Sequence, residues 1–115
     1  MRKLIVLLLA AALTAALAVP ALGSPAPKKV TVGPSSSPFS FGPKKLTIKK
    51  GTKVNFVWGP NGILHNVKVT KGPVKFTSKS QTSGSYSHLF SKRGTYTLIC
   101  IYHVALGMKM TITVT

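Results

Sequence analysis

From residue 44 onward the apolar and polar residues alternate with a period of two, which is typical of strands that bury one face. The alternation occupies six segments, residues 44–50, 53–58, 66–70, 85–90, 94–100 and 108–114. Turn residues separate them, including Gly51, Gly59-Pro60-Asn61-Gly62 and Ser83-Gly84. No segment in this part of the sequence shows a convincing helical period. The pattern predicts an all-β domain over residues 44–115, a small antiparallel sandwich or barrel.

The N-terminal residues 1–23 have the layout of a secretory signal. A basic start, Met1-Arg2-Lys3, precedes a predominantly apolar run of 16 residues, 4–19, and small residues then favour cleavage after Ala21 or Gly23. The run is slightly shorter than the roughly 20 residues that span a bilayer, although a retained membrane anchor stays open as the alternative. We therefore expect an exported protein of the periplasm, the cell envelope or the extracellular space.

Residues 24–43 are rich in Pro, Ser and Gly, which predicts a flexible leader in front of the domain. Within this leader the segment "KKVTV", residues 28–32, fits a first edge strand. The sequence thus predicts a signal at 1–23, a leader at 24–43 and one folded domain at 44–115. The part of the chain after the signal, about 92 residues, is long enough for one domain with a modest core.

The charge composition excludes several classes of function, because the chain has 16 Lys and Arg and no Asp or Glu. Without carboxylates it cannot perform the acid–base chemistry of glycosidases or aspartic proteases, or build a carboxylate cage for Ca²⁺ or Mg²⁺. The positive field favours anionic partners, namely acidic proteins, anionic polymers or lipid head groups. We expect no nucleic-acid partner, because the protein is expected to be exported and to have few exposed aromatic residues.

The stretch "CIYHVALGM" holds the one cysteine of the chain, Cys100, with His103 and Met108 after it. A lone cysteine forms no internal disulfide, so the thiol is buried, bound to something or linked to another chain. A strand ends at Cys100 and the next begins at Met108, so the connection between them can fold all three side chains around one point. Thiolate and thioether are soft ligands that favour copper over structural zinc.

A blue-copper site needs a second histidine beside the cysteine, the first histidine and a weak axial methionine. His65 ends a glycine-rich loop just before a strand, which suits a ligand that leans toward another loop. His88 is in the middle of a strand and shares its face with Tyr86 and Phe90, which favours a histidine packed among aromatic residues. His65 is therefore the preferred second histidine.

The segments "LHNVKV" and "GTYTLICIYHVALGMKMTITV" closely resemble the cupredoxins, the plastocyanin/azurin-like blue copper proteins, and the resemblance covers residues 44–115. It implies an eight-strand Greek-key sandwich that holds one copper ion. The implied ligands are His65, Cys100, His103 and Met108. It also implies that Asn66 ties the two ligand loops together, with its backbone N–H donating to the Cys100 sulfur.

The resemblance further implies that electrons leave through the edge of His103, within an apolar patch. The residues that would form this patch are Pro60, Ile63, Leu64, Val104, Ala105 and Leu106. Two positions depart from the family pattern. Val104 stands where proline is often found, and Met110 stands where glycine is common; the period-two pattern places Met110 in the core.

These features predict a small type 1 (blue) copper protein that carries single electrons as a monomer. Its expected partners are acidic redox proteins, which it binds transiently. We also expect the protein to associate with an anionic membrane or cell-wall surface. Two alternatives remain: a copper carrier or resistance protein, and a metal-free cationic sandwich that binds anionic envelope polymers with Cys100 in its core. We expect no enzyme, because copper oxidases and nitrite reductases add further copper centres and this chain has only three histidines.

Overall fold

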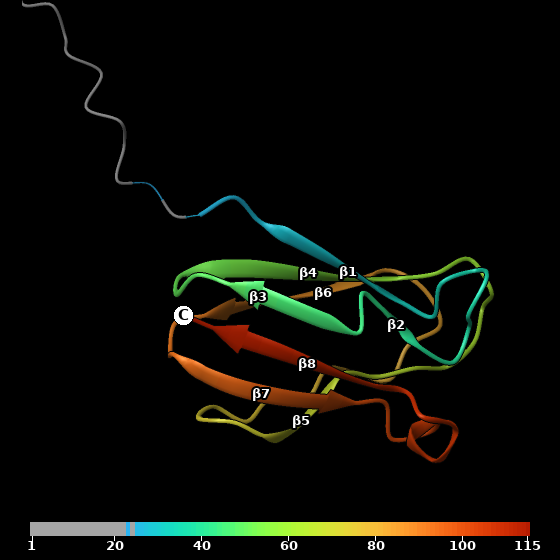
Figure 1. Ribbon diagram of the computed structural model, residues 1–115. Coiled ribbons are helices and arrows are strands. Elements are labelled where there is room, and N and C mark those ends of the chain that lie inside the picture. The colour runs from blue at the N-terminus through green and yellow to red at the C-terminus, as the bar shows by residue number, and fades with distance from the viewer. Residues whose placement is uncertain (1–22, 24) are drawn as a thin grey trace, which may run out of the picture.

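The structure, a computed structural model, describes residue 23 and residues 25–115, and it is a sandwich of two four-stranded sheets (Figure 1). The strands are β1 (Lys28–Val32), β2 (Phe41–Gly42), β3 (Lys45–Ile48), β4 (Thr52–Trp58), β5 (Lys68–Lys71), β6 (Ser85–Phe90), β7 (Gly94–Ile99) and β8 (Lys109–Val114). A single turn of 3₁₀ helix, η1 (Val104–Leu106), lies between β7 and β8. The predicted eight-strand sandwich is confirmed, whereas the secretory signal lies outside the described residues.

One sheet has the strand order β2-β1-β4-β6 and the other β3-β8-β7-β5. Most neighbouring strands are antiparallel, as expected, but β1 pairs with β4 in parallel and β3 pairs with β8 in parallel. The sheets are therefore mixed. Both parallel pairs join strands that the chain reaches only after crossing to the other sheet and back.

The core lies between the sheets and follows the period-two pattern. In β4, Val54, Phe56 and Trp58 are buried while the residues between them are more exposed. Met110 in β8 is also buried, which confirms its predicted place in the core. Full burial of one such side chain contributes about 1.5–3 kcal/mol to folding, so the inward residues of the eight strands stabilise the sandwich.

The segment before residue 44 differs from the expected flexible leader. The "KKVTV" segment is a strand, but it is internal, because β1 lies between β2 and β4 and buries Val30 and Val32 completely. Phe41 in β2 is buried as well. The sandwich therefore begins at Lys28 and not at Lys44, because the alternating apolar side chains of residues 28–43 fill part of the core.

The two ends of the sandwich are built differently. At the first, which we call the loop end, the connections 33–40, 59–66 and 101–108 lie beyond the ends of β1, β4 and β7. At the opposite turn end, the short connections 49–51 and 91–93 join β3 to β4 and β6 to β7. Figure 1 shows η1 and the longer loops together on one side and the C-terminus on the other. In the described part of the chain no helix has the length and hydropathy to cross a bilayer.

Candidate metal centre

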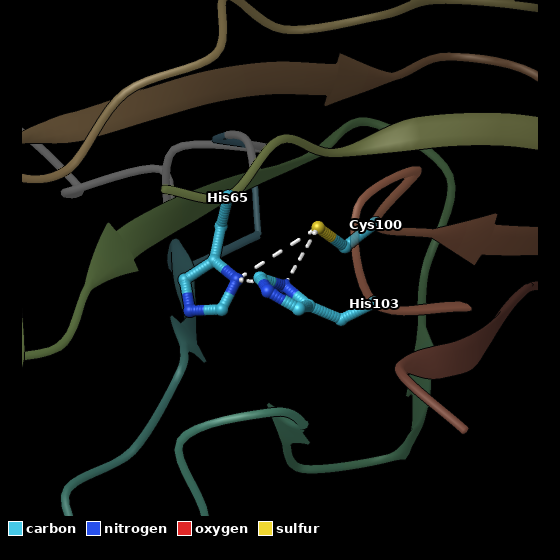
Figure 2. Close-up of side chains that lie close together, drawn as sticks. All are labelled: His65, Cys100 and His103. Carbon is cyan, nitrogen blue, oxygen red and sulfur yellow. Dashed lines mark hydrogen bonds between the residues drawn. The ribbon is translucent and has the colours of Figure 1, made fainter. Parts of the chain in front are cut away.

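Three side chains predicted as metal ligands meet at the loop end. The Nδ1 atoms of His65 and His103 lie 3.7 and 3.6 Å from the Cys100 sulfur and 3.1 Å from each other. Figure 2 shows the two imidazoles and the thiol turned toward one another. Cys100 is 0% exposed and His65 is 2% exposed, whereas His103 is partly exposed. The cluster is thus closed on the inside and reaches the surface through one imidazole.

The loop between β7 and β8 places Cys100 and His103 by backbone hydrogen bonds. The Cys100 N–H donates to the Met108 carbonyl at 3.2 Å, and the Met108 N–H donates to the His103 carbonyl at 3.2 Å. The His103 N–H in turn donates to the Cys100 carbonyl at 3.3 Å. Gly107 closes η1 with φ of 87°, a left-handed conformation that glycine adopts without strain. Met108, fully buried at the end of this loop, is held beside the other two residues.

His65 is placed from the connection between β5 and β6 and from the loop after β1. Its backbone exchanges two hydrogen bonds of 3.0 Å with Gln81. Its ring is hydrogen-bonded to the backbone of Pro38, and Nε2 is the atom on that side because Nδ1 faces Cys100. A Cβ atom at Gly33 would lie 2.6 Å from Nε2, so only glycine leaves room for the ring. With the Nε2 proton donated to the Pro38 carbonyl, the Nδ1 lone pair is directed at the cluster.

The protonation of His65 suits a ligand. Burial lowers its pKa below the ordinary value and the neighbouring His103 lowers it further, while the hydrogen bond with Pro38 opposes them. This direction favours the neutral imidazole, the form in which histidine binds a metal.

Asn66 connects the two ligand loops, as the family resemblance implied. Its Oδ1 accepts a hydrogen bond of 2.9 Å from the Ile101 N–H, next to Cys100 in the chain. Asn66 is itself buried, so the bond fixes one ligand loop against the other. The expected bond from the Asn66 backbone N–H to the Cys100 sulfur stays a prediction.

The spacing of the donor atoms fits a transition metal. Metal bonds to imidazole nitrogen and thiolate sulfur are about 2.0–2.3 Å long, so donors that surround one ion in a plane lie roughly 3.5–3.8 Å apart. The two N···S distances of 3.7 and 3.6 Å match, and the N···N distance of 3.1 Å is somewhat shorter. Two imidazoles with one thiolate are the ligand set of a trigonal blue-copper site, and the cluster therefore fits copper.

The other histidine, His88, is a packed residue, as predicted. Its ring stacks on Phe76 with a centroid distance of 3.8 Å and meets Phe90 edge-on at 4.8 Å. Burial lowers its pKa. The metal-like cluster in the described residues consists of His65, Cys100 and His103 without it.

The structure adds one aromatic residue that the sequence did not indicate. Phe39, in a segment expected to be a flexible leader, packs on the His103 ring with centroids 4.8 Å apart. Its proline- and serine-rich surroundings gave no sign of this contact, although "SPFSFG" does place Phe39 and Phe41 at period two. Gly33 and Pro38, which cradle His65, were missed for the same reason.

An apolar patch surrounds His103, but the residues that form it differ in part from those expected. Leu64, Val104 and Leu106 are exposed as expected, Leu106 to 65%. Ile63 is half-buried. Exposed large apolar residues that the sequence did not place there are Phe39, Ile101 and Tyr102. The surface next to the metal cluster is thus apolar and includes three more large side chains than expected.

Comparison with known proteins agrees with this site. The model of the family "Copper binding proteins, plastocyanin/azurin family" matches residues 28–115. Plastocyanin of Scenedesmus fuscus is 33% identical over 95 residues, which cover 74% of this chain and 96% of that protein. The structure of oxidized plastocyanin from Dryopteris crassirhizoma superimposes with a TM-score of 0.61 at 27% identity, covering 76% of this chain and 99% of that one. The copper-containing nitrite reductase of Thermus scotoductus gives a TM-score of 0.66 at 30% identity, but the 81% of this chain that matches covers only 23% of the enzyme.

Fold and site together define a copper-binding β-sandwich of the cupredoxin class. The chain belongs to the plastocyanin/azurin family of copper-binding proteins. Its cofactor is copper, which the cluster of His65, Cys100 and His103 fits by donor type and spacing.

Proposed function

We propose that the protein is an exported carrier of single electrons and not an enzyme, with His65, Cys100, His103 and Met108 as the copper ligands. Bound copper supplies the redox chemistry by cycling between Cu(II) and Cu(I). The observation that carries the proposal is the triangle of two Nδ1 atoms and one sulfur, 3.1–3.7 Å on a side, beneath an apolar surface. Met108, buried at the end of the same loop, would supply the fourth donor, a thioether sulfur.

The protein residues hold the ligands in one arrangement and exclude water. Backbone hydrogen bonds of Cys100 and Met108 fix the loop between β7 and β8, and Asn66 fixes it against the loop of His65. A site whose ligands do not move needs little rearrangement when its charge changes, which favours fast electron transfer.

The route out of the site is the exposed edge of His103. Because this imidazole is both a ligand and part of the surface, a partner that covers the apolar patch comes within contact of the cluster. Small contact areas are typical of transient redox encounters. The strongly positive chain attracts acidic redox proteins at long range, which speeds these encounters at low ionic strength.

The alternatives are less well supported. A copper carrier must open its ligands to hand on the ion, whereas His65 and Cys100 are buried. A metal-free sandwich has no reason to direct two imidazole nitrogens and a thiol at one point. An enzyme such as the nitrite reductase is a much longer chain, of which this protein matches 23%. The binding of a redox metal alone does not make a fold catalytic.

The visible absorption spectrum after addition of Cu(II) tests the proposal. We expect an intense blue thiolate-to-copper band that ascorbate bleaches, because the Cys100 sulfur is one of the donors. The Cys100→Ser variant removes the band, whereas the matched His88→Asn variant keeps it, because His88 is outside the cluster. Absence of the band in the unmodified protein would contradict the electron-carrier proposal. A band that forms but is not bleached by ascorbate contradicts the redox role.

A further inference from the structure

The charged residues of this protein are distributed unevenly. Two of the 16 cationic residues lie outside the described part of the chain, and the other 14 are all exposed. The loop-end connections 33–40, 59–66 and 101–108 contain no Lys, Arg, Asp or Glu. The connection 72–84 also reaches this end, because Gln81 pairs with His65 and Ser80 is hydrogen-bonded to Tyr102, and it brings one exposed cation, Lys79. The three connections that hold most of the apolar patch carry no fixed charge.

Half of the described cations gather at the opposite, turn end. They are Lys28, Lys29, Lys49, Lys50, Lys53, Lys92 and Arg93, and we call them the basic cluster. Strand pairing brings them together: Lys28 pairs with Val54, and Lys53 pairs with Leu89 near the turn of Lys92 and Arg93. A chain-terminal carboxylate at Thr115, whose carbonyl accepts from the Lys50 N–H, would cancel only one of these charges.

The turn end is also hollowed. A cleft of about 350 Å³ is lined by Pro25, Ala26, Lys28, Thr47, Ile48, Lys49 and Thr52. Two lysines and the Thr47 hydroxyl on its walls supply cations and a hydrogen-bond donor beside apolar carbon, whereas the buried Thr52 hydroxyl donates to the Lys49 carbonyl. A phosphodiester head group is an anion that such a mixed wall accommodates.

The chain upstream of the sandwich joins at this same end. Pro25 and Ala26 line the cleft, and β1 begins at Lys28 within the basic cluster (Figure 1). Clustered Lys and Arg side chains are attracted to anionic lipid head groups by about 1 kcal/mol for each cation near the membrane surface.

We propose that the basic cluster docks the protein on an anionic lipid bilayer, with the loop end directed away from it. The inference does not depend on copper or on electron transfer. The seven residues of β4 separate the two ends by about 20 Å. A protein docked in this way keeps the exposed edge of His103 free, because the surface that binds lipid and the surface that meets redox partners do not overlap.

The experiment is vesicle co-sedimentation of residues 23–115, which contain every strand of the sandwich. Vesicles are made of phosphatidylcholine alone or with about a third phosphatidylglycerol. One variant carries Gln at Lys49, Lys50, Lys53, Lys92 and Arg93. The matched control has the same net charge, with Gln at Lys44, Lys45, Lys68, Lys79 and Lys109, which lie outside the basic cluster.

We expect binding at low salt only to vesicles that contain phosphatidylglycerol. The turn-end variant should bind at least about 30-fold more weakly, and the control variant less than about fivefold more weakly. If the two variants lose the same amount of vesicle affinity, the vesicles recognise only the net charge of the protein. This result would contradict the proposal that the basic cluster is the surface that binds lipid. If the protein does not bind anionic vesicles but does bind soluble polyphosphate, the proposed lipid partner is wrong and the basic cluster binds an anionic polymer instead. Thermal unfolding of both variants checks that they fold, and Cys100→Ser should bind vesicles as the unmodified protein does.

Discussion

The loop end and the turn end of the sandwich are made from the same eight strands but with opposite chemistry. At the loop end, buried His65 and Cys100 and the partly exposed His103 lie beneath apolar side chains, and the connections 33–40, 59–66 and 101–108 carry no fixed charge. At the turn end, short connections place the basic cluster in solvent. The difference concerns solvation, because donors that bind a metal in a fixed arrangement need a dry site, while lysines need water around their ammonium groups.

The comparison shows how a strongly cationic protein can still present a neutral contact surface. Charges placed about 20 Å from the loop end still attract anionic partners at low ionic strength, because the Debye length is about 10 Å at 0.1 M salt and longer below that. A partner that covers the apolar patch does not have to desolvate a lysine from the connections 33–40, 59–66 and 101–108, which contain none. Three changes would break or sharpen this comparison.

The largest effect is expected from Gly33→Ala at the loop end. The new Cβ would lie 2.6 Å from His65 Nε2, and the backbone φ of 73° is strained for alanine. We expect the unfolding free energy to fall by about 3 kcal/mol and copper affinity to fall at least about 10-fold, as measured by urea unfolding and copper titration. Gly62→Ala is the matched control, since its φ is 65° with nothing within 4 Å of the new Cβ. It should cost about 1 kcal/mol and leave copper affinity unchanged. Equal effects of the two variants would show that the Gly33 contact does not position His65.

A smaller effect is expected from Asn66→Ala, which removes the bond between the two ligand loops. The Ile101 N–H loses its acceptor, which costs about 1–2 kcal/mol of unfolding free energy when the donor is partly buried. Asn61→Ala, in the exposed part of the same loop, should change stability by less than about 0.5 kcal/mol. Urea unfolding of the copper-free proteins measures both, and an Asn66 variant as stable as the Asn61 variant would contradict the role of this bond.

The smallest effect is expected from salt and concerns the turn end. Because the chain has no acidic side chain, its lysines have no carboxylate side chain to pair with and repel one another. Raising NaCl from about 50 to 500 mM should therefore raise the unfolding free energy, on the order of 1 kcal/mol, because the repulsion is screened. The five-residue turn-end variant should lose more of this dependence than its charge-matched control. Stability that falls with added NaCl would be incompatible with dominant repulsion.

The sequence predicted the strands that have a clear local signal, placed β1 at the edge of a sheet where the structure has it inside, and missed β2. The alternation in residues 53–58 and 108–114 identified β4 and β8 directly. β1 was taken for a leader with an edge strand, because proline and serine surround it and its parallel partner, β4, is remote in the chain. β2 has only two residues and leaves no periodic signal.

The same distinction holds for the metal site. Cys100 and His103 lie in one loop, and their chemistry and spacing were readable from the sequence, while His65 followed from its place at a loop end. The three are brought together in the structure. Gly33 and Phe39 contact His65 and His103 from a third segment, and no local pattern encodes a contact between segments so far apart.

The complete burial of Cys100 has a consequence for thiol chemistry in the compartment to which the protein is expected to be exported. Thiol–disulfide exchange requires the attacking sulfur to reach a disulfide, and a side chain that is 0% exposed does not. An exposed lone cysteine would be captured in mixed disulfides wherever oxidised thiols are abundant. Here the fold itself protects the sulfur, and burial opposes the capture of Cys100 in mixed disulfides before copper binds.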